Sequence, residues 1–428
     1  MATVKDARSA SRVYPWSVVA MLWFCGFFNY ADRQAIFSVL DLIGQEYKLD
    51  NLDKGAIGSS FMIVYAVSAP LAGFVVDRVS RRWLIPAGLA FWSLICAATG
   101  SARSYGQLLF YRAAEGLGES FYFPASMSIL ADYHGPRSRS RAMSIHQTSV
   151  YAGTAAGGIL AGYLGKNYGW RSPFLILGMI GLAYSAMLPF LLVEPKRGAA
   201  EESTEPLADQ ELDKPIEAKA GGLFENILAV IRIPAAAMLL AVFAGANFVA
   251  ATLLAWLPSF VKEQHGLDIF AAATVAGLFF PLGNAVGALY GGVVADIAAR
   301  RVRGGRVLVQ ASGLLLGAPF VWIAGRTSSL LTLQLALVMI GACKGMYDAN
   351  IFASVYDVVT TRVRGTAAGL MNTVAWSAGS AAPALVGWLS REHGLSAVIA
   401  WTAGVYAVAG LLALVAAYLV AHASPAAS

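Results

Sequence analysis

Seven ionisable side chains lie inside segments that otherwise have the apolar composition of membrane helices. They are Asp32, Arg33, Arg112, Glu115, Glu119, Lys344 and Asp348. An ionisable group in a membrane costs roughly 2.5–3.5 kcal/mol on insertion scales, so such a group usually lines a cavity or a proton relay. The seven also form groups of mixed sign at helical spacing. The pattern therefore predicts a solute carrier with a binding site near the middle of the membrane.

Three of these groups share one short segment. Arg112, Glu115 and Glu119 are spaced i, i+3, i+7, which places them on one face of a helix. Two neighbouring carboxylates cannot both ionise cheaply in a low dielectric, so we expect one of them to exchange a proton near neutral pH. Glu119 and Glu115 are thus candidates for proton coupling. The alternative is a fixed structural ion pair between Arg112 and one of the two glutamates.

Asp32 and Arg33 are adjacent in the first apolar segment. Neighbouring residues of a helix point about 100° apart, so the two cannot serve one partner in the same way. We expect Asp32 to take part in proton coupling and Arg33 to bind an anionic group, because the planar guanidinium binds a carboxylate through two hydrogen bonds. The alternative is that Asp32 only neutralises Arg33 or Arg112.

Lys344 and Asp348 are spaced i, i+4 and can pair along a helix. Lys344 lies 225 positions after Glu119, and we expect the two to face each other across the substrate path. A purely structural Lys344–Asp348 pair is the competing interpretation. Weaker candidates for substrate binding, for which helix packing is the alternative, are Tyr30, His146, Gln147, Tyr347 and Asn350.

Composition sets the class of protein. The chain is 57% hydrophobic and 13% charged, with a mean hydropathy of +0.61, whereas soluble domains carry about 25% charged residues. The net charge of +6 does not suggest a nucleic-acid partner. Cys25, Cys96 and Cys343 lie in apolar segments without disulfide or metal-ligand spacing, so we expect small core residues, no metal and no cofactor. No HExxH, GxxxxGK[ST] or GxSxG motif indicates an enzyme.

A membrane helix needs about 20 apolar residues, and the chain offers twelve such segments. We therefore predict an all-α membrane protein. We expect an N-terminal bundle of six helices over 1–193, a cytoplasmic linker over 194–234 with at most a short amphipathic helix at its end, and a second bundle over 235–428. The spans are 15–40, 55–76, 83–101, 107–132, 142–165, 172–193, 235–261, 269–294, 307–325, 329–356, 365–390 and 396–421.

Positive charge sets the orientation. With both termini in the cytoplasm, the cytoplasmic side holds 20 of the 31 Lys and Arg residues, the far side holds 8, and three lie in the membrane. This asymmetry satisfies the positive-inside rule. There is no Asn-x-Ser/Thr sequon. We expect a monomeric integral protein of a bacterial inner membrane.

A loop motif recurs in the two halves. Gly73-x3-Asp77-x3-Arg81-Arg82 returns as Gly292-x3-Asp296-x3-Arg300-Arg301, each time after the second span of its half. Parallel repeats of six spans, related by an axis along the membrane normal, are one architecture of transporters. The recurrence predicts two pseudo-symmetric bundles.

The first copy of this motif resembles the loop motif of the major facilitator superfamily. The resemblance extends over the whole chain, through the second copy and the Arg112-x3-Gly116-x-Gly118 pattern of the fourth span. Within the superfamily, Asn29-Tyr30-Ala-Asp32-Arg33 and Arg112-x6-Glu119 resemble two groups. One is the anion:cation symporters, which move sugar acids and other organic anions with protons. The other is the Spinster group, which moves lysolipids and sphingoid lipids.

The resemblance implies both a function and a gate. It implies proton-coupled symport of a small organic anion by alternating access, with Asp32, Arg33 and Glu119 in the roles given above. Transport of a lysophospholipid or another amphipathic lipid is the alternative. It also implies that charges of the two loops latch the cytoplasmic side when the carrier faces outward; topology alone is the alternative reading of these charges. The gating residues are Asp77, Arg81, Asp132, Asp296, Arg300 and Asp357.

Overall fold

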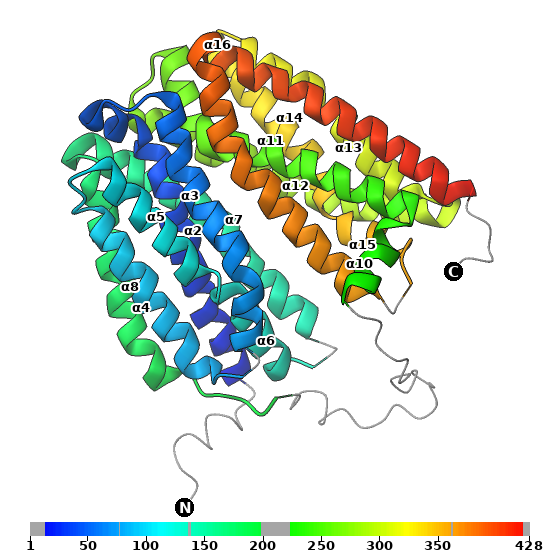
Figure 1. Ribbon diagram of the computed structural model, residues 1–428, viewed down its shortest axis with the longest axis horizontal. Coiled ribbons are helices and arrows are strands. Elements are labelled where there is room, and N and C mark those ends of the chain that lie inside the picture. Colours follow the sequence, from blue (N-terminus) through cyan, green and yellow to red (C-terminus); the bar gives the residue numbers. More distant parts are fainter. Residues whose placement is uncertain (1–12, 77, 136–137, 198–222, 361–362, 423–428) are drawn as a thin grey trace, which may run out of the picture. The chain divides into compact units, whose positions relative to one another are not determined.

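The computed structural model describes residues 13–76, 78–135, 138–197, 223–360 and 363–422 (Figure 1). Within these ranges the regular structure is helical and contains no strand. The helices follow the order of the predicted spans, and they place all seven intramembrane charges on α2, α5 and α14.

Six predicted spans of the first half correspond to seven helices. These are α2 (Tyr14–Tyr47), α3 (Asn51–Val76), α4 (Arg81–Thr99), α5 (Tyr105–Glu119) with α6 (Tyr122–Tyr133), α7 (Arg139–Tyr168) and α8 (Arg171–Leu191).

The second half repeats this plan. The short helix α10 (Leu223–Ile231) lies where we predicted an amphipathic helix at the end of the linker. It is followed by α11 (Pro234–His265), α12 (Ile269–Arg301), α13 (Gly305–Arg326), α14 (Leu330–Asp348) with α15 (Ile351–Tyr356), and α16 (Arg364–His422). The last helix contains spans eleven and twelve. Gly394 separates them with a φ of 75°, a left-handed conformation that glycine adopts without strain.

Two compact units divide the chain. The first comprises residues 1–47 and 60–217, and the second comprises residues 48–59 and 218–428. The division leaves Arg33, Arg112 and Glu119 in the first unit and Lys344 and Asp348 in the second. Each unit is described below by itself.

Helix ends follow local chemistry. The Ser104 hydroxyl accepts from the Gln107 N–H at the start of α5, and the Ser329 hydroxyl accepts from the Thr332 N–H at the start of α14. Pro234 opens α11, at a position where its missing N–H is not needed. Gly266 ends the same helix with a φ of 64°.

Eight helices are long and apolar enough to cross a membrane by length and composition. They include α16 and therefore cover nine of the twelve predicted spans. The other three spans are α2, α5 with α6, and α7. With 15 and 12 residues, α5 and α6 are each too short to span a membrane alone, because the chain breaks between them.

Two of the three charged helices, α5 and α14, break directly after their last ionisable residue. We expected one continuous span over 107–132 and another over 329–356. Instead, α5 ends at Glu119 and α6 begins at Tyr122, while α14 ends at Asp348 and α15 begins at Ile351. Interrupted helices are a feature of transporter binding sites, where free backbone groups line a cavity.

Glycines let these helices approach their neighbours closely. A Cβ at Gly116 of α5 would collide with the carbonyl oxygen of Phe61 on α3, and a Cβ at Gly341 of α14 would collide with that of Phe280 on α12. Gly116 and Gly341 are 225 positions apart, the separation that also relates Glu119 to Lys344. The two halves thus use equivalent close contacts beside their charged residues.

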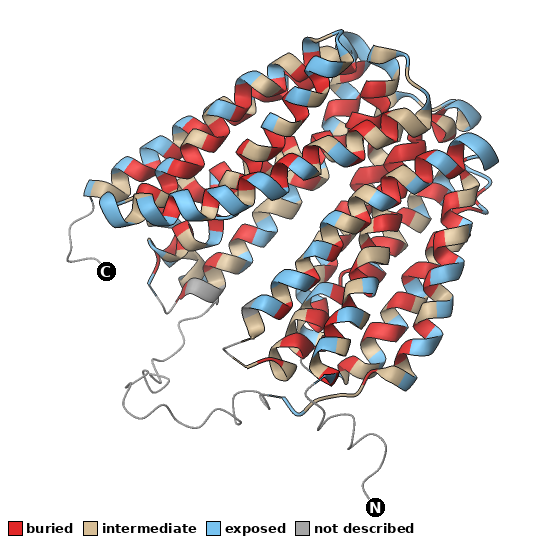
Figure 2. Ribbon diagram, turned by 180° about the vertical axis from the view of Figure 1, so that it is seen from behind, coloured by how far each residue is buried: buried red, intermediate tan, exposed pale blue. Residues whose placement is uncertain are grey.

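Burial alternates along the long helices, as Figure 2 shows. Buried faces pack within each unit, for example around Trp92 and Ile129 in the first. Large apolar side chains such as Phe190 and Leu289 are exposed, at 80% and 75%. Exposed apolar surface on helices of this length suits contact with lipid hydrocarbon.

Candidate functional site

Arg33 of α2 and Glu119 of α5 form an ion pair in the first unit. The Nη2 and Nε groups of Arg33 both donate to Oε2 of Glu119, at 2.6 and 3.1 Å. Arg33 Nη2 also donates to Oδ1 of Asn29 at 3.3 Å. The Arg33 side chain is 12% exposed and that of Glu119 is 0% exposed. The cation is thus the partner that can be reached from outside the helix packing.

Three aromatic rings surround the Arg33 guanidinium. Its Cζ lies 4.5 Å from the ring centroid of Tyr30, 4.8 Å from that of Phe61 and 5.1 Å from that of Tyr65. Cation–π attraction at such distances holds the guanidinium in place. Tyr30 was a sequence candidate. Phe61 was not, because a phenylalanine in an apolar segment gives no signal of its own.

Arg112 pairs with Glu115, which is nearer to it in the sequence than Glu119 is. Both side chains are buried, at 0% and 1% exposure. Arg112 Nε, Arg112 Nη2 and Glu115 Oε1 have no hydrogen-bond partner among the described residues. The Arg112 guanidinium also lies over the Phe61 ring, at 4.9 Å from its centroid. This contact matches the ion pair that is the alternative interpretation, and the roles of Glu115 in proton coupling and of Arg112 in substrate binding stay predictions.

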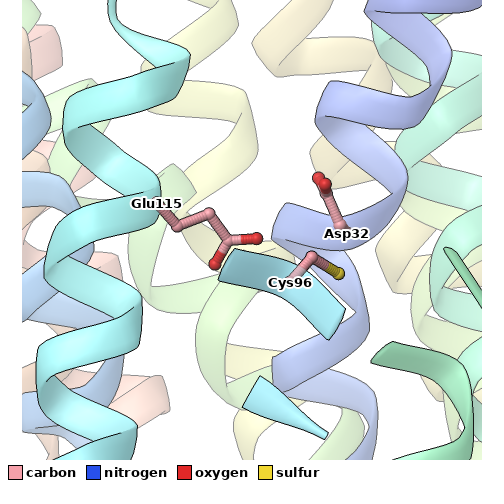
Figure 3. Close-up of side chains that lie close together, drawn as sticks. All are labelled: Asp32, Cys96 and Glu115. Atoms are coloured by element: carbon pink, nitrogen blue, oxygen red, sulfur yellow. The ribbon is translucent and has the colours of Figure 1, made fainter. Parts of the chain in front are cut away.

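Asp32 is 3% exposed, and its Oδ1 accepts from the backbone N–H of Arg33 at 2.8 Å. In the part of the chain that the structure describes, no cationic side chain donates to this carboxylate. A carboxylate oxygen of Asp32, one of Glu115 and Sγ of Cys96 lie within 4.8 Å of one another. Figure 3 shows the three side chains extending from three helices, α2, α5 and α4. Nothing in the spacing of Cys96 predicted this position.

The second unit contains its own buried pair. Lys344 Nζ donates to both carboxylate oxygens of Asp348, at 2.5 and 2.6 Å. The side chains are 7% and 33% exposed, and Asn284 of α12 donates to the same carboxylate at 3.4 Å. The pairing along α14 agrees with the spacing of the two residues. Each of Glu119 and Lys344 has its partner within its own unit, and their facing each other stays a prediction.

The weaker substrate candidates have mostly structural partners. His146 is fully buried, with Nε2 2.6 Å from the Tyr122 hydroxyl, which donates to the Leu22 carbonyl. The Asn350 amide donates to the carbonyls of Gly291 and Met346, at 3.1 Å each. For these two residues the contacts match the helix-linking alternative. Tyr347 is buried and Gln147 is half-buried.

The first loop motif holds a buried network. Arg81 is fully buried and donates to Asp132 at 2.5 Å, to Ser128 at 2.7 Å and to Glu194 at 2.8 Å. Glu194 also accepts from the Ser80 hydroxyl and the Arg82 N–H, at 3.0 and 2.7 Å. Sequence reasoning assigned Glu194 to the linker and missed it. Asp77 lies outside the described residues.

The second loop motif differs from our expectation. Arg306 rather than Arg300 binds the two acidic residues, with Asp357 at 2.9 Å and Asp296 at 3.2 Å. Arg300 is exposed. The reason lies in the spacing, because Arg81 and Arg306 are 225 positions apart, as are Asp132 and Asp357. The pairing preserves the 225-residue separation between equivalent positions of the two halves, whereas the residues of the loop motif recur at a shorter separation.

Comparisons with known proteins agree with this architecture. A family model described as "Major Facilitator Superfamily" matches residues 22–383 and 279–428. The hexuronate transporter of Bacillus subtilis is 26% identical over 410 residues, which cover 93% of each protein. The spinster protein of Drosophila melanogaster is 27% identical over 392 residues, which cover 88% of this chain and 62% of that protein.

A solved structure shares the fold. It is a bacterial homolog of the human lysosomal transporter Spinster, in an inward-facing and unoccupied conformation. The TM-score is 0.84, with 22% identity, and the match covers 97% of this chain and all of the other. The prediction of twelve transmembrane helices in two pseudo-symmetric bundles is therefore confirmed.

Proposed function

Because the chain belongs to the major facilitator superfamily, whose members are transporters and not enzymes, we propose that it is a proton-coupled symporter. Its substrate is a small organic anion such as a sugar acid or another carboxylate, moved by alternating access. The similarity to the hexuronate transporter supports the class of substrate. The Arg33–Glu119 pair supports the mechanism, and the rest of the proposal builds on it.

The pair can exchange one carboxylate for another. Arg33 is the more exposed partner, and its two hydrogen bonds to Glu119 go to a single oxygen of that carboxylate. A carboxylate of the substrate can accept the same two N–H groups. Protonation of Glu119 removes its negative charge and weakens its hold on Arg33. Binding of the anion and of the proton then support each other.

The driving force follows from charge. One elementary charge that crosses 100 mV gains about 2.3 kcal/mol. A monovalent anion carried with one proton moves no net charge, so only the pH gradient drives it. A dianion with one proton would move against a negative interior. The voltage dependence of uptake therefore reports the stoichiometry.

The second unit supplies a further cation. Lys344 is held by Asp348 much as Arg33 is held by Glu119, and Asp348 is one-third exposed. We assign Lys344 and Asp348 to substrate binding, together with Arg33 and the adjacent Tyr30. The alternative, a structural pair, is tested below.

The loop networks fit a cytoplasmic latch. The gating assignment keeps Asp77, Arg81, Asp132, Asp296, Arg300 and Asp357, and it adds Arg306, which binds Asp296 and Asp357. We also propose that both termini lie in the cytoplasm, which the distribution of Lys and Arg supports, and that the protein belongs to a bacterial inner membrane. The two-bundle division at 193 and 235 stays part of this proposal.

Transport of an amphipathic lipid is the second candidate. Both the spinster protein of Drosophila and the solved bacterial homolog of Spinster favour it. A lipid with an anionic headgroup would use the same Arg33, with its acyl chain against apolar helix surfaces. The two candidates therefore differ in substrate and not in the position of the cation.

Uptake into proteoliposomes distinguishes the two. Labelled hexuronates, other sugar acids and lysophospholipids are offered under an inward pH gradient. We expect saturable uptake of an anion that stops without the gradient. Movement of lysolipid with no anion uptake would replace the first candidate by the second. Glu392→Gln is the matched control, because it removes a carboxylate that is exposed.

A further inference from the structure

The formal charges of the ionisable groups around Asp32 do not sum to zero. The groups that act on it electrostatically are Arg33, Arg112, Glu115 and Glu119. When all are ionised, the set contains two cations and three carboxylates, including Asp32. Lys344 and Asp348 balance each other in the second unit. An unpaired buried charge is strongly destabilising, and this set of five groups lacks one positive charge, which a bound monovalent cation would supply.

The hydrogen bonds identify where this cation belongs. Arg33 binds Glu119 and Arg112 binds Glu115, which leaves Asp32 with only a backbone N–H. Glu115 Oε1 has no partner among the described residues although the side chain is 1% exposed. One carboxylate oxygen of Glu115 lies within 4.8 Å of Asp32 and Cys96 (Figure 3). Glu115 thus has an oxygen that accepts no hydrogen bond, and Asp32 has no cationic partner among the described residues. One proton shared between the two carboxylates satisfies both.

We propose that Asp32 and Glu115 share one resident proton, which is distinct from the proton exchanged at Glu119. The proposal deepens the proposed proton coupling, on which its role in transport rests. It gives Glu115 a function beyond its ion pair with Arg112. It also gives the cluster of Asp32, Glu115 and Cys96 a ligand, which is the proton itself.

A metal ion fits this cluster less well than a proton. The three residues offer two carboxylate oxygens and one sulfur, whereas hard cations such as Ca²⁺ take six or more oxygens. Arg112 already donates to Glu115. A divalent ion would therefore add more positive charge than the set lacks. A proton supplies the one missing charge and needs no further ligands.

Among the described residues, the helices that pack around the cluster bring no other charged group against it. On α4 the facing group is the Cys96 thiol, which donates to the carbonyl of Phe174 on α8 at 3.6 Å. On α3 the facing groups are the Phe61 and Tyr65 rings around Arg33. On α7, Gly157 lies against Ala31. His146 of α7 is bonded at the level of Leu22, ten residues and about 15 Å along α2.

The proton can move within the cluster. Arg112 Nε and Nη2 have no partner, so Arg112 can bind Asp32 when Glu115 releases it. In this step the O–H bond of Asp32 breaks, an O–H bond forms on Glu115, and Arg112 changes its partner from Glu115 to Asp32. The charge of the set does not change. The exchange would couple α2 to α5 at the level of Arg33.

Infrared spectroscopy of the purified protein tests the proposal without transport. A protonated carboxylic acid has a carbonyl stretching band that shifts in D2O. We expect this band in the substrate-free protein at mildly alkaline pH, where Glu119 is paired with Arg33. Asp32→Asn and Glu115→Gln should each abolish it, because either change leaves two carboxylates for two arginines. Glu115→Asp and Cys96→Ala keep both acids and should retain it.

Asp348→Asn is the matched control, because it removes an ion-paired carboxylate from the other unit and should leave the band unchanged. Absence of the band from the native protein, or its survival in either Asp32→Asn or Glu115→Gln, would overturn the proposal. Loss of the band on addition of sodium to a choline buffer would do so too, because it would identify a metal cation as the ligand. If the band pattern is as expected but transport does not depend on pH, the proposed function is refuted and the shared proton stands.

Discussion

Arg33 and Glu119 are joined through one oxygen only. Both donors of Arg33 bind Oε2 of Glu119, at 2.6 and 3.1 Å, while Oε1 of the same carboxylate is buried and has no partner among the described residues. The free oxygen can take a proton without breaking either hydrogen bond. The pair therefore combines a site for a proton with a cation that a second carboxylate can bind.

Arg33→Lys tests whether substrate binding needs the two coplanar N–H donors of the guanidinium. Lysine keeps the charge but cannot present two donors in one plane, and it loses the stacking on Tyr30 and Phe61. Loss of one charged hydrogen bond is worth about 1.5–3 kcal/mol, so we expect the apparent KM for the anion to rise roughly ten- to hundredfold. Concentration-dependent uptake measures it. An unchanged KM would remove Arg33 from substrate binding.

Lys344→Gln and the double variant Lys344→Gln with Asp348→Asn distinguish substrate binding from structure. The single change leaves Asp348 without its cation, so uptake should fall about tenfold or more under either reading. The double change restores neutrality. If Lys344 binds the anion, uptake stays low in the double variant. Recovery to the native rate would mean that the pair is only structural.

Glu194→Gln tests the network beneath the first loop motif. Its carboxylate binds Arg81 and lies at the N-terminus of α4, where a negative charge is stabilising. Loss of a hydrogen bond to a charged group costs about 1.5–3 kcal/mol, so we expect a lower Tm in detergent. Glu392→Gln serves as the control again. Equal Tm values for both variants would show that Glu194 contributes no stability.

His134 should make stability depend on pH. It ends α6, and its Nε2 lies 3.2 Å from the Pro15 carbonyl at the start of α2. Burial lowers the pKa of His134, and the bond to Pro15 opposes this only in part. The folded protein therefore binds fewer protons than the unfolded chain. The contribution of His134 is complete above its ordinary pKa of about 6.5 and is lost as pH falls through the folded pKa.

Tm measured across this range checks that sign. The native protein should lose stability on acidification more steeply than His134→Gln, which cannot titrate. His393→Gln is the control, since His393 is exposed. Parallel pH curves for the native protein and His134→Gln would contradict the assignment.

The positions of the charged residues were predictable, because a charge within an apolar segment is conspicuous in any sequence. Their pairing was not. Glu115 and Glu119 are both within reach of Arg112 on one helix face, and only tertiary packing decides that Arg33 of α2 takes Glu119. Cys96 gave no signal, since a cysteine in an apolar span usually packs in a core.

The repeated loop motif predicted the architecture but not the individual contacts. It predicted two related halves, which the fold confirms. It named Arg300 for the second loop, because the motif letters recur there. The Arg306–Asp357 pair instead preserves the 225-residue offset of Arg81 and Asp132. The helix break after Asp348 was also hidden, since that site contains no proline or run of turn residues. The break after Glu119 had a signal that we missed, because Pro124 cannot donate a hydrogen bond to the Ser120 carbonyl and disfavours a continuous helix there.

Uptake and counterflow in Glu119→Gln test the central claim most directly. Counterflow exchanges labelled for unlabelled anion across the membrane and requires no net proton movement. If Glu119 carries the coupling proton, its neutral replacement should still exchange the anion but no longer accumulate it under a pH gradient. Accumulation at the native level in Glu119→Gln would contradict the account, because coupling would then be independent of the Arg33–Glu119 pair.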